Sequence, residues 1–223
     1  MPEHTSPTPK TRLPGLDAEA TPVVGIGLGL TGIILGLRPK MAAWPLALTA
    51  LAALFYRNPK RVTPDERETL FAPADGTIVG IDEFYEHRFL HTDAVRLSID
   101  TTPIDVSVQR SPASGVVDYL EYVPGEYRPV WERRTHEHNA CQYIGITTEW
   151  GPLMIILTAG PLARRLICHI AKGDHVEAGH PLSTIRFGAR VEMILPRDLI
   201  EQLPERGQHM QAGLTRIGQV TPL

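Results

Sequence analysis

The sequence lacks a marked excess of charge of either sign. Its 223 residues hold 22 Lys and Arg against 25 Asp and Glu, a formal net charge of −3. A chain this close to neutral gives no electrostatic basis for a nucleic-acid partner, so we expect none. Cysteine is also scarce: Cys141 and Cys168 stand alone, without the spacing of a metal site. We therefore expect two reduced, buried thiols, as in a cytoplasmic domain.

Charge is almost missing from residues 21–56, which contain only Arg38 and Lys40. Two apolar runs, 23–37 and 41–56, flank these cations. As helices of 15 or 16 residues they would rise about 24 Å, which is shorter than the roughly 30 Å hydrocarbon core of a bilayer. Nothing on either run is polar enough to face water. We therefore expect a membrane hairpin rather than a helical pair buried in the soluble core.

Glycine pairs on the first run, Gly25/Gly29 and Gly32/Gly36, have the spacing that permits close helix–helix approach. We expect the two helices to meet along these glycines.

The apolar stretch at residues 21–56 divides the chain into three expected parts. Residues 1–20 are polar and Pro-rich, so we expect a disordered tail. Residues 21–56 form the membrane hairpin, and residues 57–223 form a β-rich domain. Asp17 and Glu19 precede the first apolar run and a second run follows it, so we expect no cleaved signal. The expected location is the cell membrane with the soluble domain in the cytoplasm, although basic residues on both sides leave the topology undecided.

Short β-type runs alternate with turn chemistry after residue 70. This pattern predicts a mainly β fold, an antiparallel sandwich or a small barrel. Outside the hairpin, only residues 196–202 look helical. The predicted strands are 77–81, 94–99, 105–108, 115–123, 142–146, 153–157, 165–170, 183–187 and 191–195.

One short internal repeat stands out. Gly-Asp-His-Val-Glu-Ala-Gly at 173–179 recurs 34 residues later as Gly-Gln-His-Met-Gln-Ala-Gly at 207–213. Paired segments of this kind resemble the hairpins of biotin- and lipoyl-carrier domains. A carrier needs a lysine at a hairpin tip, and Lys172 precedes the first segment instead. We therefore do not expect a swinging-arm carrier.

Five motifs carry a wider resemblance, running in order from the hairpin to near the C-terminus. They resemble those of phosphatidylserine decarboxylases of the short bacterial and archaeal form. In chain order they are Phe55-Tyr-Arg57-Asn-Pro59-Lys-Arg61, Ala72-Pro-Ala-Asp75-Gly76, Asp105-Val-Ser107-Val-Gln109-Arg110-Ser-Pro112-Ala-Ser-Gly115, Ala159-Gly160-Pro-Leu-Ala163-Arg164-Arg165 and Arg186-Phe-Gly188-Ala189-Arg190-Val191.

The resemblance implies a barrel-sandwich-like fold and a specific chemistry. In that family a serine after a glycine attacks the glycine carbonyl, and the chain is cut to leave a pyruvoyl group on the new end. The pyruvoyl carbonyl forms a Schiff base with phosphatidylserine and takes up the electrons left when CO₂ departs, giving phosphatidylethanolamine. No metal is implied.

The sequence departs from the family at the residues that do this chemistry. Ala189 occupies the serine position after Gly188, and alanine has no hydroxyl from which a pyruvoyl group could form. Ser107 occupies a histidine position, so an imidazole for proton transfer is missing as well. Asp75 is kept and resembles the general base of self-cleavage. Ser183-Thr184 could supply another hydroxyl, but these residues are not preceded by the Phe-Gly pair that precedes Ala189.

Two further groups are candidates for binding. Arg164 and Arg165 would alternate across a strand, so that one could meet a lipid phosphate. His136 and His138 are two residues apart, so in a strand they would share a face, but a third metal ligand is not evident. We expect no metal there.

Two functions follow from these features. One is a catalytically silent relative that binds aminophospholipid at the bilayer, or that pairs with an active partner chain or a second copy. The other is a working phosphatidylserine decarboxylase of phospholipid biosynthesis. The loss of two chemical positions favours the silent relative.

Overall fold

The computed structural model describes residues 15–17, 19–66, 68–129, 135–200 and 202–220. Most of the expected tail, residues 1–14, lies outside this range. The chain separates into two compact units, of which one ends at Lys60 and the other begins at Arg61. Each unit is described by itself.

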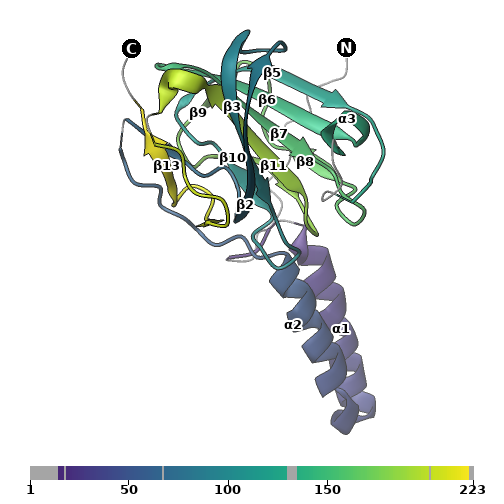
Figure 1. The fold of residues 1–223 in the computed structure, drawn as a ribbon. Helices are drawn as coiled ribbons and strands as arrows, with labels where there is room; N and C mark the ends of the chain where they lie inside the picture. The colour runs from purple at the N-terminus through teal and green to yellow at the C-terminus, as the bar shows by residue number, and fades with distance from the viewer. Residues whose placement is uncertain (1–14, 18, 67, 130–134, 201, 221–223) are drawn as a thin grey trace. The chain divides into compact units, whose positions relative to one another are not determined.

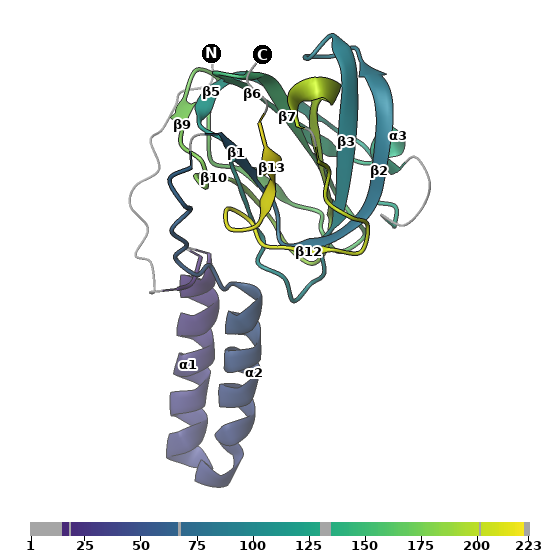
Figure 2. The ribbon, with the colours of Figure 1, turned by 60° about the vertical axis from the view of Figure 1, so that its left-hand side comes forward.

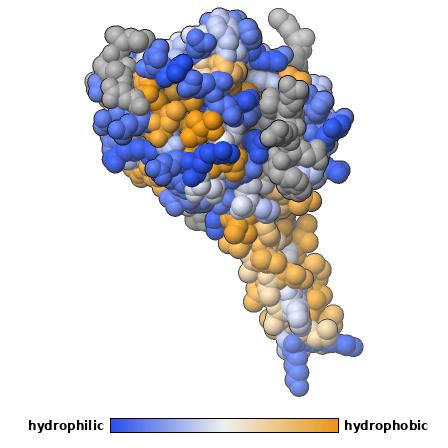
Figure 3. Space-filling model, viewed as in Figure 1, coloured by the Kyte–Doolittle hydropathy of each residue, from blue (hydrophilic) through white to orange (hydrophobic). Residues whose placement is uncertain are grey.

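The first unit is a pair of apolar helices, α1 (Ala20–Leu37) and α2 (Ala43–Phe55), joined by a short 3₁₀ turn, η1 (Pro39–Met41). The two helices lie side by side (Figure 1). Large apolar side chains face outward, with Ile26 67% and Trp44 74% exposed, and Figure 3 shows the pair as a hydrophobic surface. Within the described residues, α1 is the one helix long and apolar enough to cross a membrane. The predicted helical pair is confirmed.

The close approach of the two helices occurs at a different glycine from those predicted. A Cβ added to Gly27 would lie 2.2 Å from the Thr49 hydroxyl, so only glycine fits there. Gly25, Gly29, Gly32 and Gly36 have nothing within 4 Å of an added Cβ. The prediction that these four glycines form the contact is wrong, because they lie on faces of α1 that are turned away from α2.

The second unit is built around an antiparallel sheet of eight strands that curls into a half-barrel (Figure 2). The strand order is β12-β2-β3-β11-β7-β6-β5-β9. In that order the bounds are His209–Met210, Gly76–Glu86, Thr92–Asp100, Arg190–Pro196, Gly151–Thr158, Cys141–Thr148, Gly115–Val123 and His175–Val176.

Two smaller sheets complete the β-domain. One pairs β1 (Thr69–Phe71) with β13 (Arg216–Gln219), and the other has the order β4 (Val108–Arg110), β10 (Pro181–Ile185), β8 (Leu166–Cys168). Alternate residues of the long strands, such as those of β3 and β11, point into one continuous apolar core. The mainly β fold expected from the sequence is confirmed.

One local prediction is wrong. The helix predicted at 196–202 is not present over the described residues 196–200: Arg197–Leu199 make one 3₁₀ turn, η2, and Ile200 is extended and bridges to Val220. Thr135–His138, where the sequence predicted neither helix nor strand, form a helical turn, α3.

Candidate functional site

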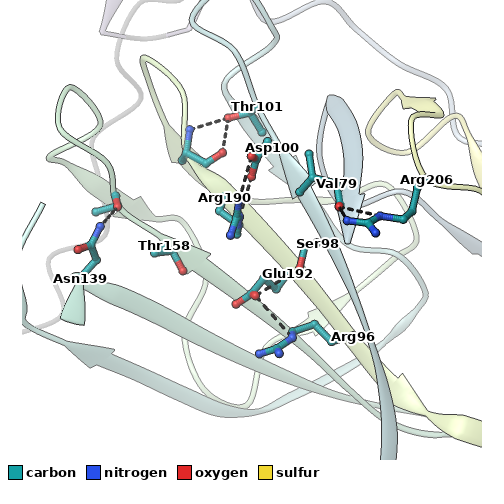
Figure 4. A network of polar contacts seen from close by, with 12 residues as sticks. Val79, Arg96, Ser98, Asp100, Thr101, Asn139, Thr158, Arg190, Glu192 and Arg206 are labelled. Carbon is teal, nitrogen blue, oxygen red and sulfur yellow. Dashed lines mark hydrogen bonds and ion pairs between the residues drawn. The ribbon is translucent and has the colours of Figure 1, made fainter. Parts of the chain in front are cut away.

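The candidate site lies where three neighbouring strands of the large sheet, β2, β3 and β11, end side by side. Thr77 of β2 pairs with Asp100 of β3, and Asp100 pairs with Arg190 of β11. The Arg190 guanidinium donates to both Asp100 carboxylate oxygens, at 2.7 and 3.0 Å. Figure 4 shows this pair beside Thr101. Ala189 directly precedes β11, so the ion pair fixes the strand that follows it.

Thr101 holds the Ala189 backbone from both sides. The Thr101 hydroxyl accepts a hydrogen bond from the Ala189 N–H at 2.8 Å and donates to the Ala189 carbonyl at 3.0 Å. The Thr101 N–H donates to the same carbonyl at 2.9 Å. The Thr101 hydroxyl is therefore engaged with the N–H and the carbonyl of Ala189.

The residues before Ala189 have unusual backbone angles. Phe187 has φ +69° and Gly188 has φ +81°. The left-handed region costs a residue such as Phe about 1–2 kcal/mol. A Cβ at Gly188 would approach the Thr101 carbonyl to 3.0 Å, so glycine suits this position on two counts. The backbone before Ala189 is therefore a tight turn that requires glycine at position 188.

The Ala189 methyl group is fully buried, in a small apolar cluster with Ala163 and Ile185. The Ile185 N–H donates to the Ser107 carbonyl at 3.0 Å. The structure thus brings together three of the motif segments, those containing Ala163, Ser107 and Ala189.

Asp75 lies at the same edge of the sheet. Its neighbour Gly76 fits against β3 so tightly that an added Cβ would be 2.4 Å from the Asp100 carbonyl oxygen. The Asp75 carboxylate is 7% exposed and accepts two parallel bonds from Arg61, at 2.5 and 2.7 Å. It also accepts the Ala212 N–H at 2.8 Å. In the described part of the chain, no hydrogen bond joins Asp75 to Ala189.

A second cation flanks this carboxylate. Arg110 is buried, and burial lowers the pKa of its guanidinium, as does the neighbouring charge of Arg61, while Asp75 partly compensates. The Asp75 carboxylate therefore has two arginines, Arg61 and Arg110, as charged neighbours.

Arg164 and Arg165 are not in a strand, contrary to the prediction. They precede β8, and both are exposed. Arg164 donates to the Pro161 carbonyl at 3.0 Å and lies 5.7 Å from the centre of the Tyr127 ring. The two side chains do not alternate across a sheet because the chain reaches β8 only at Leu166.

The histidine pair lies in a helical turn. His136 and His138 lie in α3, so the strand geometry that would give them one face does not apply. The described residues contain no group of three or more potential metal ligands.

The alternative hydroxyls are already engaged. The Ser183 hydroxyl donates to the Gln109 side chain at 3.1 Å, and the Thr184 hydroxyl lies 2.7 Å from His169 Nε2. Both residues are buried within β10. Sequence reasoning missed His169, Thr101 and Arg61, because each contributes to the site through partners far away along the chain.

The two cysteines are free; Cys141 is buried and Cys168 half-buried. Burial raises the pKa of both thiols. The predicted burial is confirmed for Cys141 and met only in part for Cys168.

Comparison with known proteins agrees with the motifs. The sequence profile named "Phosphatidylserine decarboxylase" matches residues 48–218. A phosphatidylserine decarboxylase proenzyme of Symbiobacterium thermophilum is 34% identical over 210 residues, covering 94% of this chain and 97% of the relative. That of Carboxydothermus hydrogenoformans is 33% identical over 173 residues, covering 78% and 81%. This chain belongs to the phosphatidylserine decarboxylase family.

The pyruvoyl group that this family uses does not fit the residues present. The group is made from a hydroxyl-bearing side chain after the scissile glycine, and Ala189 offers a methyl group at that point. The methyl is fully buried, and the hydroxyl bonded to this peptide belongs to Thr101. No catalytic step through a pyruvoyl group follows from these side chains.

Proposed function

We propose that this chain is a catalytically silent member of its family. It stays in one piece and does not decarboxylate phosphatidylserine. It serves phospholipid metabolism at the membrane, by binding an aminophospholipid or by pairing with a second copy or an active relative. The observation that carries the proposal is the Ala189 methyl group at the scissile position.

The surrounding contacts support this proposal. The Thr101 hydroxyl is hydrogen-bonded to both the N–H and the carbonyl of Ala189, which favours an intact peptide. Ser107 places a short hydroxyl where an imidazole would be needed to move protons. The apolar helix α1 supports a location at the bilayer.

An activity assay tests the proposal. Purified full-length chain is incubated with phosphatidylserine vesicles, and released CO₂ and phosphatidylethanolamine are measured. The rate should equal that of vesicles alone. Measurable turnover would mean that the chain is a working phosphatidylserine decarboxylase and would contradict the proposal.

A gain-of-function variant tests which positions matter. Ala189→Ser with Ser107→His returns both missing groups, and should yield two fragments on a denaturing gel. Ala189→Val with Ser107→His carries the same histidine without a hydroxyl, and should remain whole. If the serine variant also stays whole, the loss of these two groups does not explain the silence.

A further inference from the structure

The segment that opens the β-domain, residues 61–66, contacts the rest of the domain through Arg61, Thr63 and Glu66. We name it the exit segment because it follows the apolar helix pair in the sequence. Its first residue, Arg61, makes the two parallel bonds to Asp75 and a third to the Ala212 carbonyl at 2.9 Å. Its last residue, Glu66, pairs with Arg216. The Arg61 side chain is only 8% exposed.

The site of this contact occurs twice in the fold. Residues 73–76 read Pro-Ala-Asp-Gly and residues 112–115 read Pro-Ala-Ser-Gly. Each of these turns leads into a long strand, β2 or β5, and each packs on one of the two repeated glycine segments, 207–213 or 173–179. The sequence repeat is therefore part of a structural repeat of two halves.

The two halves make matching backbone contacts. Met210 pairs with Gly76, and Val176 pairs with Gly115. An added Cβ at either Gly76 or Gly115 would lie 2.4 Å from a carbonyl oxygen of the adjacent strand. The first glycine of each segment also donates to the matching strand, Gly207 to Ile78 and Gly173 to Val117.

The two turns differ at the residue before the strand glycine, which is Asp75 in one half and Ser114 in the other. In one half, Asp75 accepts the Ala212 N–H at 2.8 Å. In the other half, the Ser114 hydroxyl accepts the Ala178 N–H at 3.1 Å. A hydroxyl therefore suffices to hold this turn. The carboxylate at Asp75, and the buried charge that comes with it, exceed what the turn requires.

The exit segment runs between the two halves. An added Cβ at Gly179 would be 1.8 Å from the Thr63 hydroxyl, and one at Gly213 would be 3.0 Å from it. These are the final glycines of the two repeated segments, and both have positive φ, +78° and +71°. Thr63 thus occupies the space that both glycines leave open, and Arg61 is held at Asp75 on one side of it.

We propose that the Asp75 carboxylate is the anchor of the exit segment: it binds Arg61, and through Arg61 it clamps residues 61–66 between the two halves of the domain. A serine at position 75 could also accept the hydrogen bond from the Ala212 N–H. Only a carboxylate can form the ion pair with Arg61 that holds the exit segment. This task commits the carboxylate to three donors. It does not depend on whether the chain is catalytically silent.

The test places at position 75 the side chain that the other half has at the matching position, a serine. Asp75→Ser in the full-length protein should keep the turn and cooperative unfolding but release the exit segment. Hydrogen–deuterium exchange of peptides covering 61–66 should speed up about tenfold or more, because local opening becomes easier. Trypsin should cut faster after Lys60 and Arg61 in the folded protein. Arg61→Met should give the same increase in exchange, and the double variant no more than Arg61→Met alone.

Ser114→Ala is the matched control, because it removes the corresponding N–H acceptor, and a serine hydroxyl carries no charge that could pair with an arginine. It should leave exchange of 61–66 unchanged. Unchanged exchange in Asp75→Ser or in Arg61→Met would overturn the anchor. Loss of cooperative unfolding in Asp75→Ser would also overturn it, because the fold itself would then require the carboxylate.

Discussion

At the scale of single residues, the central features are the methyl group of Ala189 and the Thr101 hydroxyl that is hydrogen-bonded to the Ala189 backbone. Ala189 cannot attack the Gly188 carbonyl, and Thr101 holds its amide and carbonyl in place. Phe187 and Gly188, which precede this bond, both have positive φ.

Thr101→Val should lower the free energy of unfolding by about 2 kcal/mol, because the buried Ala189 N–H loses its acceptor. Urea unfolding followed by circular dichroism measures this. Thr101→Ser keeps the hydroxyl and should cost less than half as much. Equal losses in the two variants would contradict this account, because the methyl group of Thr101 would then contribute as much as its hydroxyl.

At the scale of elements, the β2–β3 hairpin is closed by a single carboxylate. Glu86 is buried and accepts the backbone N–H groups of Arg88, Phe89 and Leu90 at 2.6–2.7 Å. Burial raises the pKa of Glu86, but these three bonds outweigh it and the net pKa is lowered from 4.5.

The sign of this shift fixes the pH dependence. A carboxyl whose pKa is lower in the folded state stabilises the protein above pH 4.5, and this contribution is lost as pH falls through the folded pKa. Glu86→Gln should therefore cost about 2 kcal/mol at pH 7. The difference from the parent should shrink below pH 4.5. Exposed Glu149→Gln should show neither effect in the same pH series of urea unfolding.

The helix pair offers a prediction with a built-in comparison. Gly27→Leu should separate α1 from α2, because its side chain would collide with Thr49. The expected loss is about 1–3 kcal/mol, measured by titrating the protein in mild micelles with a denaturing detergent. Gly29→Leu points into open space and should change little. The reverse order would contradict the observed helix contact.

The sequence was informative about elements where patterns are long. The apolar helices and the long strands β2, β3, β5 and β11 follow from hydropathy and alternation. The strands β9 and β12 have two residues each, which is too short to show an alternation of apolar and polar side chains. Only the repeated glycine segments indicated hairpins there. At the site, the motifs pointed to Asp75, Ser107 and Ala189. The tie from Arg61 to Asp75 depends on folding and could not be read from spacing.

At the scale of the whole molecule, an uncharged helix pair and a charged β-domain share one chain. The full-length protein should float with liposomes in a density gradient. Ile33→Lys with Leu48→Lys places charge on exposed positions of the two helices, at about 2.5–3.5 kcal/mol each in a bilayer centre. This variant should float less. Ile104→Lys, at an exposed position of the β-domain, should float as the parent does.

The most direct test of the silent-relative proposal is the intact mass of the purified, full-length chain under denaturing conditions. The account predicts one species of 24.6 kDa, with the bond between Gly188 and Ala189 unbroken. Two species corresponding to residues 1–188 and 189–223, the smaller with a blocked N-terminus, would contradict it.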